Sequence, residues 1–477
     1  MVKYQAEQTI HPTLVGKRGQ RRPARSLIGF DFAFDAILIV LGTCLLGLSM
    51  IEAFWERPEL WSSCCLLVIN GVLSAFGFML AVREGRPLFV TVFYFDFIFF
   101  SVGPLQQIKI MEDPIYAETD LVNFAILLCA TFSLTGLAFL FFNRLPLFSK
   151  RRTNRFLSRS VFTNNFQPVI LFFTSAGLST ALLIFFMPVL FVSREAFGQL
   201  LADNFEKTME VLFSSYLIPL SVISALVGLV AARRARSMQW TVAFSLCLLV
   251  AQLVNNPIIT ARFRASTLIV FMLMLYFGWR NTRALASFLI FGTFISRALN
   301  AFRYDFPSDD YTESLQSGQG FFDTMDYHIL NLICYTIKYT YNYGYSFGSN
   351  ILSYLLFFIP RPLWEDKSDD IGVYLLPFIK QYRNYGTANL SSPLISEGFF
   401  AFGLIGAILL PAMALFALSF IERRAAAAEH GSPWHFMVCV SPMLTMILMR
   451  GPFIVGYSEF CGAFAAILTS VLLLRLG

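Results

Sequence analysis

Twelve apolar runs, separated by polar intervals, dominate the pattern of the chain. They cover residues 30–53, 61–81, 87–106, 120–142, 167–192, 211–231, 239–256, 264–279, 284–302, 398–420, 435–450 and 456–474. Most approach the length of about 20 residues that a helix needs to cross a bilayer. Their apolar residues do not alternate with polar ones as barrel strands do, so the backbone is satisfied in lipid only as helix. The pattern predicts an all-α polytopic membrane protein with about 12 transmembrane helices.

Composition supports this class. The 477 residues are 56% hydrophobic and 14% charged, whereas a soluble domain carries roughly 25% charged residues. The eight cysteines form no CxxC pair and lie mostly within apolar runs, which favours buried thiols over disulfides or a metal knuckle. Basic residues are spread over short loops beside the runs, so no nucleic-acid surface is indicated.

The distribution of Lys and Arg predicts the orientation. With the N-terminus inside, the cytoplasmic segments contain 22 of the 36 Lys and Arg residues, as the positive-inside rule requires. Both termini are therefore expected in the cytoplasm. The predicted parts are a cytoplasmic basic tail (1–29), spans 1–9 (30–302), an external periplasmic loop (303–393) and spans 10–12 (394–477).

Residues 344–359 are apolar enough to resemble another span. Counting them as a crossing would place Arg423 and Arg424 outside and reverse the end of the chain. We therefore expect 303–393 to be one external loop, in which 327–341 and 348–359 form amphipathic or re-entrant helices. Loops of this length often carry function.

Charged residues within the spans or at their outer ends are the first candidates for chemistry, since charge is costly in lipid and usually functional there. Asp96 lies in the middle of its span. Five others are expected near the outer level, where they would surround an outward-facing polar cavity: Arg262, Arg264, Arg297, Glu397 and Arg450.

Each of these residues also has a structural interpretation. Arg297 and Asp96 would neutralise each other, and the remaining arginines would be anchors whose charged ends reach the membrane interface. Glu397 would be an acidic residue in the first turn of a helix, where the helix dipole favours it.

Several residues of the external loop are further candidates. Arg361 and Lys367 are cations beside turn signals, and His328 is the external histidine. Tyr339 and Tyr343 would either stack on sugars or lie at the lipid interface. The pairs Asp309–Asp310 and Asp369–Asp370 each follow a serine and indicate helix starts or turns rather than metal ligands.

The chain has neither a GxxxxGK[ST] loop nor a dinucleotide glycine motif. A synthetic reaction on the outer face therefore needs a substrate that arrives already activated, such as a sugar linked to a lipid diphosphate. Arginine suits the leaving diphosphate because its planar guanidinium binds phosphate oxygens in pairs and stays charged. A carboxylate near the acceptor hydroxyl would serve as general base. No metal or cofactor is needed for this set of residues.

Four segments resemble the bacterial O-antigen and exopolysaccharide repeat-unit polymerases (Wzy type). FIPRPLWEDKSDD is similar to that family's iPR-x-W-x-x-K loop, and NLSSPLISEGFFAFGLIGA is similar to its GE-x-x-x-x-fG helix start. RPLFVTVFYFDFIFFSVGPL resembles the third span of the family, and NPIITARFR resembles its arginine turn. Two departures are Ser368 after the loop lysine, where the family often has proline, and SEG in place of GE.

The resemblance implies a GT-C-like fold and a metal-independent glycosyltransferase. It would polymerise undecaprenyl-diphosphate-linked oligosaccharides at the outer face of the inner membrane. Its implied partners are those lipids, the bilayer, a chain-length regulator and a flippase. By motif, Arg262, Arg361 and Lys367 would hold diphosphate, and Glu397 would be the acidic residue at the helix start. Arg264 is a second arginine in its turn, so either member of that pair is the functional one.

Two other functions remain open at this point. An O-antigen ligase would use the same lipid-linked donor and a histidine of the large external loop, for which His328 is the candidate. A transporter or flippase of lipid-linked sugars would need broken helices near the middle of the membrane. Asp96 is the only charge found deep within a span, which disfavours a transporter.

Overall fold

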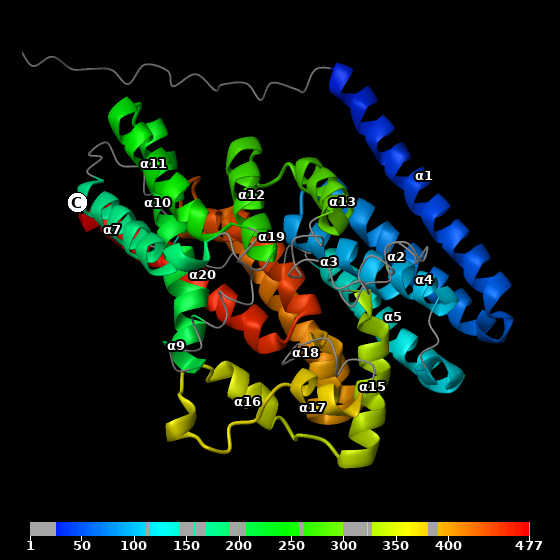
Figure 1. The fold of residues 1–477 in the computed structure, drawn as a ribbon. Coiled ribbons are helices and arrows are strands. Elements are labelled where there is room, and N and C mark those ends of the chain that lie inside the picture. The colour runs from blue at the N-terminus through cyan, green and yellow to red at the C-terminus, as the bar shows by residue number, and fades with distance from the viewer. Residues whose placement is uncertain are drawn as a thin grey trace, which may run out of the picture. The chain divides into compact units, whose positions relative to one another are not determined.

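The computed structural model of the chain describes residues 25–110, 114–142, 157, 160, 168–190, 200, 204, 207–256, 262–298, 322, 327–379 and 390–476. The chain separates into two compact units, Met1–Cys44 and Leu45–Gly477. Apart from residues 25–44 of the first helix, the features below belong to the second unit. Every regular element in the described ranges is a helix (Figure 1). Asp309 and Asp310, most of the basic tail, and residues 380–389 lie outside the described part.

The main helices are α1 (Arg25–Glu56), α2 (Trp61–Glu84), α3 (Pro87–Phe97), α4 (Gly103–Ile110), α5 (Thr119–Phe142), α7 (Val169–Phe186), α9 (Lys207–Leu212), α10 (Ile218–Arg234), α11 (Met238–Val254), α12 (Arg262–Phe277), α13 (Thr282–Ala298), α15 (Ile329–Tyr343), α16 (Ser349–Leu355), α17 (Ile371–Phe378), α18 (Leu394–Ala427), α19 (Pro433–Arg450) and α20 (Phe453–Leu476). Short π-helical stretches join α3 to α4 (Ile98–Val102) and α9 to α10 (Phe213–Leu217).

Seven helical stretches of the described chain are long and apolar enough to cross a membrane. They are Pro58–Glu84, Pro87–Ile108, Thr119–Phe142, Val169–Val189, Met209–Arg234, Leu394–Ala427 and Phe453–Leu476. The predicted all-α membrane class is therefore confirmed. Each of the twelve predicted runs overlaps a described helix. Helices α11 and α12 are apolar but shorter, so twelve crossings stay a prediction.

The predicted loop contains three described helices, α15, α16 and α17. Figure 1 shows them together at one end of the helices, beside the beginning of α18. Helix α15 coincides closely with the predicted helix 327–341 and packs against α5 and α18. Helix α16 has only 7 residues, about 10 Å at 1.5 Å per residue, and is too short to cross a bilayer.

A buried polar network joins α2, α3 and α5 around Asp96. The Asn70 amide donates to Asp96 Oδ1 at 3.2 Å, and the Ser133 hydroxyl donates to Asp96 Oδ2. The Asn70 amide also lies 3.3 Å from the Phe100 carbonyl oxygen, in the π-helical stretch where the α-helical hydrogen bonding is interrupted. Because Asp96 is fully buried and has partners on two other helices, it links these helices together.

A second buried carboxyl, Glu422, caps the start of α3. Its Oε1 atom accepts from the backbone N–H of Leu88 at 2.8 Å, and its Oε2 atom lies 3.4 Å from Arg86 Nη1. The first N–H groups of a helix lack partners within the helix, and a carboxylate there satisfies them and complements the dipole. Glu422 thus connects α18 to α3.

Helix α18 is broken near its beginning. Phe402 and Gly403 have non-helical backbone angles, and Gly403 has a φ of +61°, which favours glycine. Gly398 and Gly406, eight residues apart, touch across the break. A Cβ added to Gly398 would lie 2.2 Å from the Gly406 carbonyl oxygen, and one added to Gly406 would lie 1.9 Å from that of Gly398. The first two turns therefore fold back against the long part of the helix.

The turn before α16 packs on this break. The backbone N–H of Ser346 donates to the Phe400 carbonyl oxygen at 2.9 Å, which the interrupted helix leaves without its usual partner. Gly348 has a φ of +83°, and a Cβ there would collide with the Phe402 ring. The broken helix and residues 344–350 consequently form one structural unit.

Replacing Gly398 by Ala should destabilise the protein by at least about 2 kcal/mol, because the methyl group meets backbone that cannot move aside. Thermal unfolding in detergent measures the effect. Gly177→Ala in α7 is the matched control, since nothing lies within 4 Å of its added Cβ, and it should unfold at the wild-type temperature or above. Equal melting temperatures for Gly398→Ala and wild type would contradict the close approach.

Candidate functional site

Glu397 lies in the first turn of α18 and is fully buried. Its Oε2 atom accepts hydrogen bonds from the Tyr354 hydroxyl at 2.7 Å and the Asn350 amide at 3.2 Å. Its Oε1 atom makes no hydrogen bond of good geometry with any described residue. One oxygen of the carboxyl group is therefore held by two side chains, and the other has no side-chain partner among the described residues.

Both donors to Glu397 come from α16. Asn350 and Tyr354 are four residues apart, so they lie on the same face of the helix. The Asn350 amide also donates to the Glu397 carbonyl oxygen at 3.3 Å. The Tyr354 ring is buried and packs against Phe453 of α20, with ring centroids 5.8 Å apart. The short α16 is thus held between the start of α18 and the start of α20.

A second carboxyl group, that of Asp370, lies close enough to interact with Glu397 and Tyr354. Asp370 is the residue before α17, as the sequence predicted for a helix start, and it is nearly buried. Burial raises the pKa of the Tyr354 hydroxyl well above its usual value, and the Glu397 and Asp370 carboxyls raise this pKa further. The backbone N–H of Ile371, in the first turn of α17, faces the Glu397 carboxyl. Residues far apart in the sequence therefore surround one buried glutamate.

The loop between α16 and α17 contains the predicted cations. Arg361 forms an ion pair with Asp369, and both side chains are partly exposed. Lys367 instead donates to three backbone carbonyls, those of Leu356, Phe357 and Ile359, at 2.8–3.3 Å. Burial lowers the pKa of the Lys367 ammonium, and the nearby Arg361 guanidinium lowers it further. These contacts give Lys367 a loop-closing role, whereas Arg361 stays accessible.

The predicted tyrosines belong to an aromatic cluster on α15, α17 and α18. The Tyr339 ring lies 4.7 Å from Tyr343, 6.2 Å from Tyr374 and 5.7 Å from Phe378, measured between centroids. Tyr343 is 67% exposed. Tyr339 therefore fills the core of this cluster, and Tyr343 continues it onto the surface.

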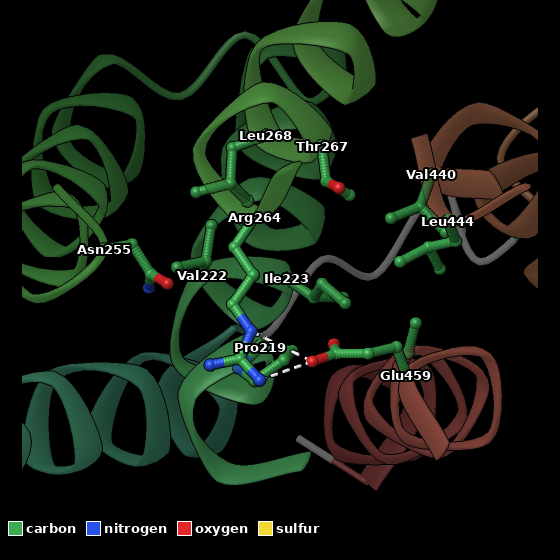
Figure 2. Close-up of a pocket in the computed structure, with 11 residues that line it drawn as sticks. Pro219, Val222, Ile223, Asn255, Arg264, Thr267, Leu268, Val440, Leu444 and Glu459 are labelled. Atoms are coloured by element: carbon green, nitrogen blue, oxygen red, sulfur yellow. Dashed lines mark hydrogen bonds and ion pairs between the residues drawn. The ribbon is translucent and has the colours of Figure 1, made fainter. Parts of the chain in front are cut away.

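Arg264 lines a separate cavity, of about 410 Å³ counting its open part, between α10, α11, α12, α19 and α20 (Figure 2). Its Nε and Nη2 atoms both donate to Glu459 Oε1, at 2.9 and 2.5 Å, and Figure 2 shows the third nitrogen pointing away from Glu459. Most of the remaining lining is apolar, with Asn255 and Thr267 as its other polar side chains. Arg264 is thus neutralised within the helices.

Helix α20 separates the two sites. Its residues Phe453 and Tyr457, one turn apart, contact Tyr354 and Phe357 of the α16 segment. Glu459 follows two positions after Tyr457, which rotates it about 200° around the helix axis. Arg264 therefore faces a different side of α20 from the Glu397 cluster. Of the predicted site residues, Glu397 and Arg361 lie on connected segments, and Arg264 lies apart from them.

The structure places the remaining candidates individually. The Arg450 guanidinium lies over the Phe99 ring at 5.9 Å, and His328 is a nearly buried residue immediately before α15. Arg262 begins α12 and Arg297 lies near the end of α13, but their side chains are outside the described part of the structure. Their predicted phosphate contacts stay predictions. Within the described ranges, no group of three or more His, Cys, Asp or Glu side chains could hold a metal ion.

Sequence reasoning missed Asn350, Tyr354 and Glu459. A signal existed for the first two, since a polar residue and a tyrosine four apart lie on one face of any helix formed there. Glu459 is an acidic residue inside an apolar run, which marks it for a partner in another span.

No family model, curated protein or solved structure matches this chain. The described helices define an all-helical membrane protein with a buried glutamate beside the short helix α16.

Glu459→Ala should destabilise the protein by about 3–5 kcal/mol, because it leaves the Arg264 guanidinium buried without its carboxylate. The side chains of Arg264 and Glu459 are only 17% and 3% exposed. Glu59→Ala, which removes the exposed pair with Arg57, is the control and should cost at most about 1 kcal/mol. Thermal unfolding in detergent compares them, and equal losses would show that burial does not strengthen the Arg264 pair.

Proposed function

We propose that the protein is a metal-independent membrane glycosyltransferase. It polymerises undecaprenyl-diphosphate-linked oligosaccharide repeat units into O-antigen or exopolysaccharide on the outer face of the bacterial inner membrane, with both termini in the cytoplasm. The observation that carries the proposal is Glu397, whose carboxyl has one oxygen held by two side chains and the other without a side-chain partner among the described residues. The family resemblance of the two segments around it supplies the reaction.

The reaction needs a proton acceptor, which is Glu397 in this proposal. The hydroxyl oxygen of an incoming lipid-linked unit attacks the anomeric carbon of the growing glycan, and the bond from that carbon to the diphosphate breaks. The hydroxyl proton passes to Glu397 Oε1, and the lipid diphosphate leaves with the bonding electrons. A positioned general base typically contributes 10²–10⁴-fold in rate.

The leaving diphosphate needs a fixed cation, and Arg361 suits this task. Its side chain is 41% exposed, so an anion can reach it, and its guanidinium can bind two phosphate oxygens at once. Its partner Asp369 directly precedes Asp370, which faces Glu397. The adjacent residues Asp369 and Asp370 therefore connect Arg361, the proposed cation, to Glu397, the proposed base.

The surface next to Arg361 is apolar. Phe358 and Leu363 are 60% and 80% exposed on the same loop. Exposed large apolar side chains beside a cation fit the membrane interface, where a lipid diphosphate places its charged head and its hydrocarbon tail. This surface supports a donor that stays in the bilayer.

The surroundings of Glu397 also suit an acceptor rich in hydroxyl groups. The hydroxyls of Ser353, Ser392 and Ser396 are buried and have no hydrogen-bond partner among the described residues. Buried polar groups generally need partners, and sugar hydroxyls both donate and accept. Because Glu397 itself is buried, the acceptor reaches Oε1 only through a change that leaves the contacts of Asn350 and Tyr354 with Oε2 in place.

The other sequence candidates take different places in this proposal. Arg264 is not assigned to the reacting diphosphate, since it faces another side of α20. Lys367 holds the loop that carries Arg361. Arg262, Arg297 and Arg450 stay predicted substrate ligands, and Tyr343 is a predicted stacking surface for sugar.

Glu397→Gln and Arg361→Ala should each lower polymerisation of purified lipid-linked repeat units at least 100-fold, because one removes the base and the other the cation. Gel separation of the products by chain length measures this. Arg280→Ala, at a guanidinium stacked on Trp279, is the control and should retain wild-type chain lengths. Long polymer from Glu397→Gln, in protein that melts at the wild-type temperature, would remove Glu397 from the reaction.

A further inference from the structure

We infer that Asn350 and Tyr354 of α16 are positioning residues that hold Glu397 Oε2 and so direct Oε1 toward the acceptor hydroxyl. This inference rests on the proposed function, because it assigns the orientation of the proposed base. Neither residue touches the reacting atoms. Both act through the glutamate.

The orientation of the Asn350 amide is fixed by the acceptor oxygens of Glu397. The Ser346 hydroxyl donates to Asn350 Oδ1 at 2.6 Å. The opposite end of the amide, the Nδ2 group, points toward Glu397, where it reaches both the carboxyl and the backbone carbonyl. A reversed amide would lose these contacts and place its oxygen against a carboxylate. The Glu397 carbonyl oxygen, which can only accept, therefore determines that the Nδ2 end of Asn350 faces Glu397.

The packing of the Tyr354 ring fixes the direction in which its hydroxyl group points. Its ring is only 1% exposed and is packed against Phe453. Its hydrogen bond to Oε2 is 2.7 Å long, an ordinary length for a hydroxyl donor. Asn350 and Tyr354 together restrict the Glu397 side chain to one arrangement.

This arrangement is compatible with both protonation states of the carboxyl. When Oε1 takes a proton, Oε2 becomes a carbonyl oxygen that still accepts from Asn350 and Tyr354. Proton transfer therefore requires no rearrangement of α16, a condition that favours general-base catalysis. If the donors instead faced Oε1, the incoming proton would displace one of them.

A purely structural role is the alternative, and pH dependence separates the two. Among the described residues, the titratable groups that interact with the Glu397 carboxyl are Tyr354 from α16 and Asp370 from the start of α17. Removing the Tyr354 hydroxyl withdraws a hydrogen bond that stabilises the ionised carboxylate. The loss should make the carboxylate harder to form, whereas a structural defect would lower activity equally at every pH.

The test is the pH–rate profile of Tyr354→Phe in the full-length protein, with synthetic undecaprenyl-diphosphate-linked repeat units as substrate. The acidic limb should move to higher pH by about one unit, which makes the rate on that limb about tenfold slower. Asn350→Ala should move it in the same direction and serves where Tyr354→Phe does not fold. Tyr276→Phe, an exposed tyrosine on α12, should leave the profile unchanged. An unmoved limb in both α16 variants would overturn the inference.

A second measurement does not depend on activity. The infrared carboxyl band that disappears in Glu397→Gln identifies the Glu397 group, and its titration can be followed in wild type and Tyr354→Phe. The midpoint should rise in the variant, and an unchanged midpoint overturns the inference. Wild-type protein that makes no polymer at any pH would refute the proposed function, while the infrared titration would still decide whether Tyr354 holds Glu397.

Discussion

The close approach of Gly398 and Gly406 is the constraint on which the proposed site depends. It allows the start of α18 to fold back, and it places Glu397 beside α16 instead of along the continuous helix. The break also releases carbonyls, which the turn at Ser346 and the amide of Asn350 satisfy. A Cβ at either glycine would clash with the backbone across the break, so the contacts between α16 and Glu397 depend on this close approach.

The buried carboxyl groups Asp96, Glu422 and Glu459 each contact a residue of another helix. Asp96 joins α2, α3 and α5, Glu422 caps α3 from α18, and Glu459 pairs with Arg264. Each contact satisfies a group that would be costly in lipid. A charge within a span is therefore weak support for catalysis by itself. Glu397 differs because its Oε1 atom, unlike the Oε2 atom of Glu422 beside Arg86, has neither a hydrogen bond of good geometry nor an ion pair with a described residue.

The sequence predicts helices well here because hydrophobic length and charge placement are local properties. The twelve apolar runs fall on helices, and the apolar segment 344–359 contains the short α16, which cannot cross a bilayer by itself. Side-chain partners are not local. Lys367 is of a residue type that commonly binds phosphate, yet its ammonium group donates to three backbone carbonyls of its own loop. The partner of Arg264 is 195 residues away, and no spacing rule connects them.

The size distribution of cell-surface glycans, compared between cells with and without this protein, tests the central claim most directly. Polymerisation predicts that deletion abolishes the ladder of long chains while single repeat units are still attached to the surface. Loss of all attached glycan would indicate a ligase instead. Accumulation of lipid-linked units facing the cytoplasm would indicate a flippase, and either result would contradict the proposal.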